Sequence, residues 1–341
     1  MLNGSTFRVP IDRSWTTSGL KSHLAAESGI LECDMALVSG GQTLEDEVAL
    51  LEPSSPLSQQ ENPLAQLLQV RRHRVLTGGW DKLLRLWDVD TGELLVEMRG
   101  HSGAVTCAAT GREVQRAISG GYDGQLIIWD LATGAPLRTL SGHADAVNCV
   151  AVDWATGRAL SGSDDHSLRC WRLDDGSCSV MMRTYKSAVN CLDADWCGLR
   201  AVSGGDDGDL RLWDLARGEL LNRFAGHTDS VNCVSAVWAS ARVVSGGDDG
   251  ALLLWDLESG ELLRTLAAPS FEPLDPHHGY IETAIHAMAL GFSEGRVVTG
   301  SRDHAIRVWD LCTGALVREL RSHAGPVLCL AADWAAGSLV S

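Results

Sequence analysis

Short apolar segments alternate with turn-forming residues along most of this chain. Between residues 143 and 185 the apolar run 146–152 is followed by the turn sequence DWATG, by RALSGS, and by the Gly, Ser and Asp residues of GSDDHS. The alternating segment 167–173 and the segment 178–184 come next, separated by DDGS. Short runs bounded by clusters of Gly, Ser and Asp are typical of strands joined by tight turns. The pattern predicts four strands, at 146–152, 158–163, 167–173 and 178–184.

The same unit recurs along the chain with a nearly constant period. Tryptophans in an apolar strand follow one another at steps of 42, 42, 42, 42 and 54 residues, each preceded by a Gly-Gly or Gly-Ser anchor with a nearby Asp. A small sheet that is apolar on both faces cannot bury these faces by itself. Repeats packed face to face around a ring bury both faces of every sheet. The repeat tryptophans are Trp87, Trp129, Trp171, Trp213, Trp255 and Trp309.

This unit resembles the WD40 repeat, from about residue 63 to the end of the chain. The resemblance implies a mainly β fold, with a WD40 β-propeller over residues 63–341. We expect the seven-bladed type with an incomplete last blade, because Ser341 falls inside a repeat unit. A second closure is also open: the strand 327–332 would supply an inner strand that the first blade lacks, which would close six blades.

The resemblance also implies a polar network within each blade, made by a His, a Ser or Thr, an Asp and the repeat Trp. A Ser–His–Asp set is also the composition of a hydrolase triad, which requires an exposed nucleophile beside an oxyanion hole. Recurrence in several units, and the need of a buried Trp N–H for a partner, favour a structural network. In the fourth and sixth units Tyr185 and Ile281 replace the His, so we expect incomplete networks there. The members are His101, Ser119, Asp123 and Trp129; His143, Ser161, Asp165 and Trp171; Ser203, Asp207 and Trp213; His227, Ser245, Asp249 and Trp255; and Thr299, Asp303 and Trp309.

Propellers of this family bind peptides on their top face, and the resemblance assigns two positions per blade to that face. In the third to fifth units these positions hold an Asn and, 16 residues later, an Asp. Carboxylates beside an aromatic rim suit an Arg or Lys side chain, so we expect a basic partner segment there. The alternative is a solvated rim whose register reflects only the copying of an ancestral repeat. The positions are Trp80, Thr106, Tyr122, Asn148, Asp164, Asn190, Asp206, Asn232, Asp248, His286 and Arg302.

Residues 1–62 carry no repeat. The sequence SGLKSHLAAESGI reads as a short amphipathic helix, and MALVSGGQTLEDEVALL as a strand, a Gly-Gly turn and a second short segment. This order resembles part of a ubiquitin-like β-grasp fold, whose first strand would precede residue 1. If AQLLQVRR (65–72) is the last strand of this fold, the segment extends to residue 72. The alternative is that residues 63–69 form the inner strand of the first blade. The resemblance implies a receptor-binding patch at Leu37 and Val38; core or edge-strand positions are the alternative.

Charge and composition narrow the functional classes. The chain has 341 residues and a formal net charge of −16, which repels phosphate backbones and disfavours nucleic acid. No apolar run is long enough to span a membrane, and the N-terminus lacks the apolar core of a secretory signal. Five of the ten cysteines keep the repeat register, as buried hydrophobes do. We therefore expect reduced thiols and an intracellular protein, with the cytoplasm as the expected compartment and the nucleus as the alternative.

The sequence contains no P-loop, no GxGxxG after a strand, no HExxH and no CxxC, so we expect no cofactor, no metal and no enzymatic activity. The remaining prediction is a scaffold or adaptor that presents a propeller face to other proteins and links them to ubiquitin-system receptors. The alternative is a substrate-recognition component of a ubiquitin ligase complex. Both rest on resemblance at the family level.

Overall fold

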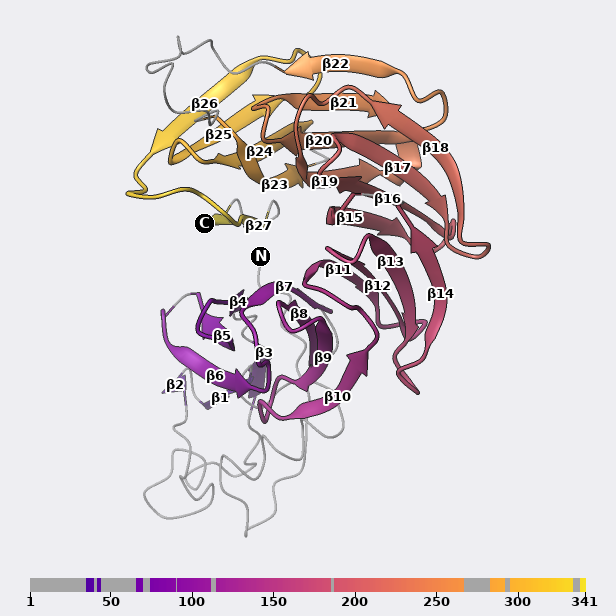
Figure 1. Cartoon of the computed structure of the whole chain (residues 1–341). Coiled ribbons are helices and arrows are strands. Elements are labelled where there is room, and N and C mark those ends of the chain that lie inside the picture. The colour runs from indigo at the N-terminus through magenta and orange to yellow at the C-terminus, as the bar shows by residue number, and fades with distance from the viewer. Residues whose placement is uncertain are drawn as a thin grey trace, which may run out of the picture. The chain divides into compact units, whose positions relative to one another are not determined.

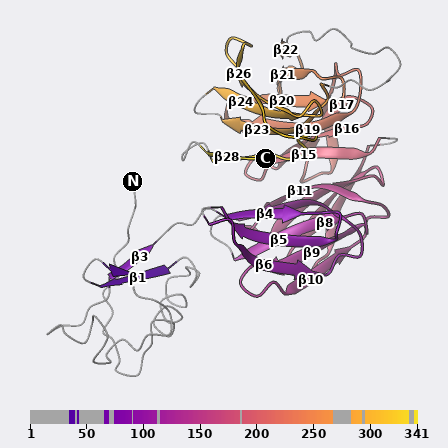
Figure 2. The same cartoon turned by 90° about the vertical axis from the view of Figure 1, so that its left-hand side faces the viewer.

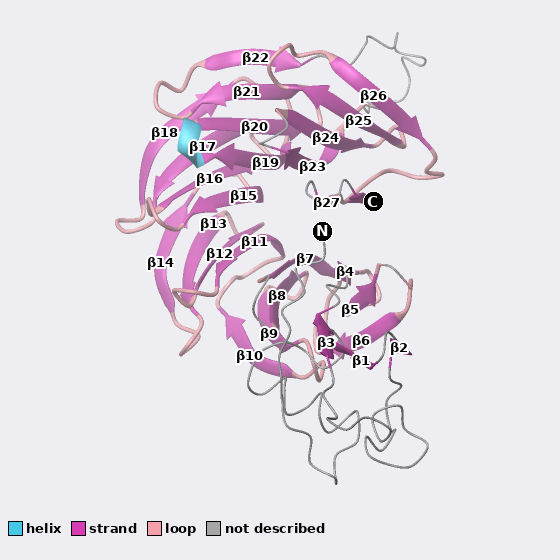
Figure 3. Cartoon of the chain, turned by 180° about the vertical axis from the view of Figure 1, so that it is seen from behind, coloured by secondary structure: helices cyan, strands magenta, loops and turns pink. Residues whose placement is uncertain are grey.

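The computed structural model describes residues 35–39, 42–43, 66–69, 74–89, 91–111, 115–184, 187–266, 283–291, 295–333 and 338–341. This part of the chain consists almost wholly of strands (Figure 3), and its one helical segment is the 3-10 turn η2 (Trp238–Ser240). The strands are grouped into a series of small antiparallel sheets that follow one another along the chain (Figure 1).

Five of these sheets have four strands each, and we number them as blades 2 to 6. Blade 2 comprises β7 (Val105–Thr110), β8 (Arg116–Gly121), β9 (Gln125–Asp130) and β10 (Pro136–Ser141). Blade 3 comprises β11 (Val147–Asp153), β12 (Arg158–Ser163), β13 (Ser167–Arg172) and β14 (Cys178–Arg183). Blade 4 comprises β15 (Val189–Asp195), β16 (Arg200–Gly205), β17 (Asp209–Asp214) and β18 (Glu219–Ala225). Blade 5 comprises β19 (Val231–Val237), β20 (Arg242–Gly247), β21 (Leu252–Asp256) and β22 (Leu262–Leu266). Blade 6 comprises β23 (Ile285–Gly291), β24 (Arg296–Ser301), β25 (Ala305–Asp310) and β26 (Leu316–Arg321).

Blade 1 has only three described strands, β4 (Arg74–Gly78), β5 (Leu83–Asp88) and β6 (Leu94–Arg99), which lie side by side in Figure 2. After blade 6 the chain forms a two-stranded hairpin of β27 (Ala331–Asp333) and β28 (Ser338–Val340). The described chain therefore has six blades, and the expectation of seven is wrong, because a two-stranded hairpin does not make a blade. The alternative closure is not seen either, since β27 pairs with β28 and blade 1 keeps the order β4-β5-β6.

Three short strands are described before blade 1. β1 (Met35–Ser39) pairs antiparallel with β2 (Gln42–Thr43) and with β3 (Gln66–Gln69). In this register Leu37 lies opposite Leu67, and Val38 opposite Thr43 and Gln66. The predicted helix in SGLKSHLAAESGI and most of residues 1–62 lie outside the described residues, as do Tyr185 and Ile281.

The core lies within and between the blades. The second and third strands of blades 2 to 6 are almost continuously buried, and Trp129, Trp171, Trp255 and Trp309 are among the largest fully buried side chains. One cluster joins Leu160 and Leu168 of blade 3 to Val189 and Trp213 of blade 4. Burial of apolar surface between consecutive sheets therefore stabilises the stack, as expected for repeats that contact only their neighbours.

A glycine in each second strand allows the next blade to approach closely. A Cβ atom added to Gly162 would lie 2.4 Å from the Val189 Cγ1 of the following blade, and one added to Gly204 would lie 2.6 Å from Val231 Cγ1. Gly120 faces Val147 in the same way, at 2.7 Å. The first Gly of the recurring Gly-Gly pair, and the Gly of Gly-Ser, thus has a packing role that no larger residue can fill.

A β-bulge interrupts each fourth strand at the same repeat position. The pairing of β9 with β10 shifts between Pro136 and Arg138, which leaves Leu137 as the extra residue. Bulges on outer strands are common and disfavour edge-to-edge association. The extra residues are Leu137, Ser179, Leu221, Leu263 and Val317, and the four apolar ones are exposed.

Candidate interaction surface

The predicted polar networks form within blades 2, 3 and 5. In blade 3 the Trp171 Nε1–H donates to Ser161 Oγ at 2.8 Å, and His143 Nε2 lies 2.7 Å from the same oxygen. His143 Nδ1 lies 2.9 Å from Asp165 Oδ2. Because the Ser oxygen accepts from Trp, its O–H donates to Nε2, and the Nδ1–H of a neutral His donates to Asp. The same bonds join Trp129, Ser119, His101 and Asp123 in blade 2 and Trp255, Ser245, His227 and Asp249 in blade 5.

These networks are arranged for stability rather than catalysis. The Oγ atoms of Ser119, Ser161 and Ser245 belong to residues with 0% exposure, and each is engaged by both a Trp and a His. A nucleophile needs an accessible oxygen, which these serines do not offer.

The networks also shift the pKa values of their members. Burial acts to raise the pKa of the Asp123 carboxyl, but hydrogen bonds from His101 and from the Ser102 backbone N–H outweigh it and lower the pKa. Burial lowers the pKa of His143 below its ordinary value, although the Asp165 carboxylate acts in the opposite direction. His143 is therefore held in its neutral form near pH 7, as the hydrogen-bond pattern requires.

Blades 4 and 6, whose repeats lack the His, use an arginine instead. In blade 4 the Arg211 guanidinium bonds both carboxylate oxygens of Asp207, with Nη1 at 3.1 Å from Oδ1. In blade 6 Arg307 bonds Asp303 in the same way, with Nη1 at 3.2 Å from Oδ1. The indole donors keep their partners, with Trp213 Nε1 at 2.9 Å from Ser203 Oγ and Trp309 Nε1 at 3.0 Å from Thr299 Oγ1.

Sequence reasoning missed these arginines, although a signal was present. Both lie two residues before the repeat Trp, a position that holds Ile127 in blade 2 and Leu253 in blade 5. Both are buried, and the bidentate pair with a carboxylate gives the guanidinium a partner that an apolar environment requires. The networks of blades 4 and 6 are thus altered rather than merely incomplete.

Three Asn–Asp pairs occupy the predicted top-face positions of blades 3, 4 and 5. In each pair the Asn Nδ2 donates to the Asp Oδ1. The Asn148 and Asn232 amides also donate to the Val189 and Ile285 carbonyls of the following blade, at 3.2 and 3.1 Å. Within the described chain no donor reaches the carboxamide oxygen of an Asn or the second carboxylate oxygen of an Asp. We call this set the Asn–Asp row: Asn148 with Asp164 at 2.6 Å, Asn190 with Asp206 at 2.8 Å, and Asn232 with Asp248 at 2.7 Å.

Two aromatic side chains continue the repeat position of the Asp residues into blades 1 and 2. Trp80 is 81% exposed and Tyr122 is 51% exposed, with ring centroids 5.5 Å apart. Tyr and Trp are enriched at protein interfaces, because one end of each side chain is apolar and the other can form hydrogen bonds.

The remaining predicted positions are engaged within the protein. The Thr106 hydroxyl donates to the Gly120 carbonyl at 3.0 Å and also lies against Val147 O. The His286 Nδ1 lies 3.4 Å from the Asn232 amide, and burial lowers the pKa of His286. The Arg302 backbone N–H donates to the Ala284 carbonyl.

The sheets, their Gly anchors and their His–Ser–Asp–Trp networks define a repeat-built β-propeller. Comparison with protein families matches this chain to "WD domain, G-beta repeat" over residues 92–130, 134–172, 176–214, 218–256 and 271–310, which together cover more than half of it. The chain therefore belongs to the WD40 family, and the expectation of a mainly β WD40 propeller is confirmed. Comparison with curated proteins gave no match.

The family has a general functional meaning. WD40 propellers are typically non-enzymatic scaffolds that bind other proteins.

In the part of the chain that is described, no helix is both long and apolar enough to cross a membrane. The nine cysteines of that part are free thiols, and burial raises the pKa of Cys107, Cys170 and Cys233 to about 12, so these three are unreactive.

Proposed function

We propose that this propeller is a scaffold whose Asn–Asp row binds an arginine-containing segment of a partner protein. The observation that carries the proposal is the geometry of the row. Each Asn donates an amide hydrogen to the neighbouring Asp, so the row offers three carboxamide oxygens and three second carboxylate oxygens as acceptors, against a single spare N–H, that of Asn190, among the described residues. A guanidinium has only donors and a positive charge, and it suits such a surface better than any other side chain.

The spacing of the pairs supports an extended partner. The first strands of blades 3, 4 and 5 are neighbours, and the Asn148 and Asn232 amides reach the backbone of the next blade. The three Asn residues therefore lie on adjacent strands, and each holds its Asp carboxylate from the turn that follows β12, β16 or β20. Trp80 and Tyr122 add aromatic faces on which a cation or an apolar side chain of the partner can stack.

The test is an affinity pull-down with the parent chain and with a triple variant, Asp164→Asn, Asp206→Asn and Asp248→Asn. The substitutions keep side-chain shape and remove three negative charges. We expect the variant to lose mainly basic partners, and the partners of the parent to be released at higher salt. A single Asp175→Asn variant, at an exposed position outside the row, serves as control. Recovery of every partner by the triple variant, with unchanged salt dependence and an intact circular dichroism spectrum, would refute the proposal.

A link to the ubiquitin system is a second proposal. The pairing of β3 with β1 supports assigning 65–72 to the N-terminal segment rather than to blade 1. In that case Leu37 and Val38 lie on the strand that would carry a receptor-binding patch. The variants Leu37→Ser and Val38→Ser should then lose ubiquitin-receptor partners while keeping basic ones; recovery of a ligase among the parent's partners would favour a substrate-recognition component instead. We also propose a location inside the cell, in the cytoplasm, which the nine free thiols of the described residues support.

A further inference from the structure

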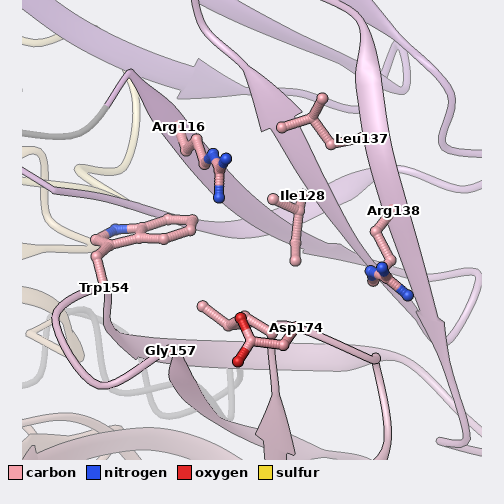
Figure 4. Close-up of a pocket in the computed structure, with 8 residues that line it drawn as sticks. Arg116, Ile128, Leu137, Arg138, Trp154, Gly157 and Asp174 are labelled. Atoms are coloured by element: carbon pink, nitrogen blue, oxygen red, sulfur yellow. The ribbon is translucent and has the colours of Figure 1, made fainter.

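A groove lies between blades 2 and 3, at the other end of the strands from the Asn–Asp row. The first strand of blade 3 connects the two sites: Asn148 of the row lies near the start of this strand, and Trp154 of the groove lies just beyond its end. The groove encloses about 300 Å³ between β10 and the turns that follow β11 and β13. Its walls are drawn in Figure 4, where Arg116 and Asp174 lie on opposite sides of a space bordered by Trp154 and Ile128.

Three charged side chains line this groove: the Arg138 guanidinium donates to the Asp175 carbonyl at 3.0 Å, whereas Arg116 and Asp174 have no partner among the described residues. Among the described residues, the guanidinium of Arg116 makes no hydrogen bond, ion pair or ring contact, and neither does the carboxylate of Asp174. Both side chains are exposed. The indole N–H of Trp154 is buried and also lacks a partner within the described chain.

The equivalent grooves of the next blades are closed by their own residues. Between blades 4 and 5, Arg200 lies over the Trp238 ring at 5.7 Å and bonds Glu258 at 3.3 Å. Residues 200, 238 and 258 are 84 positions, or two repeats, after Arg116, Trp154 and Asp174.

Between blades 3 and 4, Arg158 lies over the Trp196 ring at 5.6 Å and bonds the hydroxyl of Thr156 at 3.0 Å. An arginine packed on a tryptophan thus closes two grooves, although Ala216 stands at the position of Asp174 in the second of them, and the groove between blades 2 and 3 is left open.

The lining of the open groove defines what would fill it. Trp154, Ile128 and the bulge residue Leu137 form apolar walls, which suit one bulky aliphatic side chain. The unpaired Arg116 suits a carboxylate, which a guanidinium binds through two parallel hydrogen bonds. Asp174 on the other side repels a carboxylate and accepts backbone N–H groups, so it sets the direction in which a segment lies.

We propose that this groove binds a short partner segment in which a bulky aliphatic side chain stands next to a glutamate or aspartate. The aliphatic side chain packs on Trp154 and Leu137, the carboxylate pairs with Arg116, and the segment's backbone N–H groups face Asp174. This site selects acidic segments, whereas the Asn–Asp row would select basic ones, so a partner of one is excluded from the other by charge. The inference does not depend on the proposed function of the row.

The test uses two capped dipeptides, N-acetyl-leucyl-glutamyl amide and N-acetyl-leucyl-glutaminyl amide, titrated into the full chain labelled with ¹⁵N at its tryptophan indoles. The Trp154 signal is assigned from its absence in Trp154→Phe. We expect the glutamyl peptide to shift this signal saturably, with a dissociation constant on the order of 1 mM for so small a ligand. The glutaminyl peptide should bind about tenfold more weakly, because it lacks the charge-assisted pair.

Two variants separate this groove from its neighbours. Arg116→Gln removes an exposed side chain and should weaken the glutamyl peptide about tenfold, to the level of the glutaminyl peptide. Arg200→Gln alters the equivalent position of a closed groove and should leave the Trp154 response unchanged, as should the triple Asp→Asn variant of the row. The proposal is overturned by the absence of a saturable Trp154 shift, by equal binding of the two peptides, or by full binding in Arg116→Gln.

Discussion

Arg211 and Arg307 show how single residues keep a repeat intact when its usual member is missing. In blades 2, 3 and 5 a His bonds the hairpin Asp, whereas in blades 4 and 6 a guanidinium does so from two residues before the Trp. Blade 3 has both, since Arg169 lies 3.7 Å from the same Asp165 that His143 bonds at 2.9 Å. The carboxylate is therefore the constant feature, and its donor varies.

Arg211→Leu should be destabilising, because it leaves Asp207 without its main charged donor. We expect the free energy of unfolding to fall by about 1–3 kcal/mol, the cost of losing a hydrogen-bonded charge partner that is partly open to solvent. Arg169→Leu, the matched change in blade 3, should cost less than half of that because His143 still holds Asp165. Urea denaturation of both variants measures the difference, and equal losses would show that the arginine of blade 4 has no special role.

His143 gives a pH dependence of defined sign. Because its folded-state pKa is lowered, mainly by burial, the unfolded chain binds a proton more readily than the folded one. The stabilisation by neutral His143 is complete above the unfolded pKa of about 6.5 and is lost as the pH falls below it. We expect urea midpoints to decline from pH 7 to pH 5, with a shallower decline in His143→Gln. An unchanged slope in this variant would contradict the assignment of a neutral histidine to the network.

At the scale of strands and sheets, much was predictable from the sequence. The strands expected at 158–163 and 178–184 are found at Arg158–Ser163 and Cys178–Arg183, because Gly, Asp and Ser turns mark strand ends locally. The reduced blade 1 was harder to predict. Residues 66–69 are apolar enough for either sheet, and their pairing with β1 depends on contacts between distant segments. Periodicity locates strands but does not choose their partners.

Gly162 tests the packing between blades. A methyl group there would meet Val189 Cγ1 at 2.4 Å and Cys149 Sγ at 2.7 Å, both within a buried first-strand layer. We expect Gly162→Ala to lower the free energy of unfolding by about 1–3 kcal/mol, the usual cost of overpacking. Gly325→Ala, where no atom lies within 4 Å of the new Cβ, should be close to neutral. Thermal melts of the two variants provide the comparison, and a neutral Gly162→Ala would mean that the blades can separate without cost.

At the scale of the whole molecule, the propeller and its network residues could be inferred from the repeat, but the state of its surfaces could not. The Asn–Asp register is visible in the sequence, yet the direction of its hydrogen bonds, which leaves the carboxamide oxygens and the second carboxylate oxygens free as acceptors, needs coordinates. Likewise, the sequence shows Arg116, Arg158 and Arg200 as equivalents, whereas only the packing of neighbouring blades shows that Arg116 has no partner among the described residues. Hydrogen bonds within each blade decide the first feature, and contacts between neighbouring blades decide the second.

Recognition of arginine by the Asn–Asp row can be measured with a pair of matched peptides. A capped, fluorescently labelled peptide with two arginines is compared with the same peptide carrying citrulline, which keeps the shape and removes the charge. Fluorescence anisotropy with the parent chain should show at least a tenfold preference for arginine, falling with added salt. The triple Asp→Asn variant should lose this preference while remaining folded. Equal affinity of the parent for the arginine and citrulline peptides, or an arginine preference that survives in the triple variant, would contradict the account.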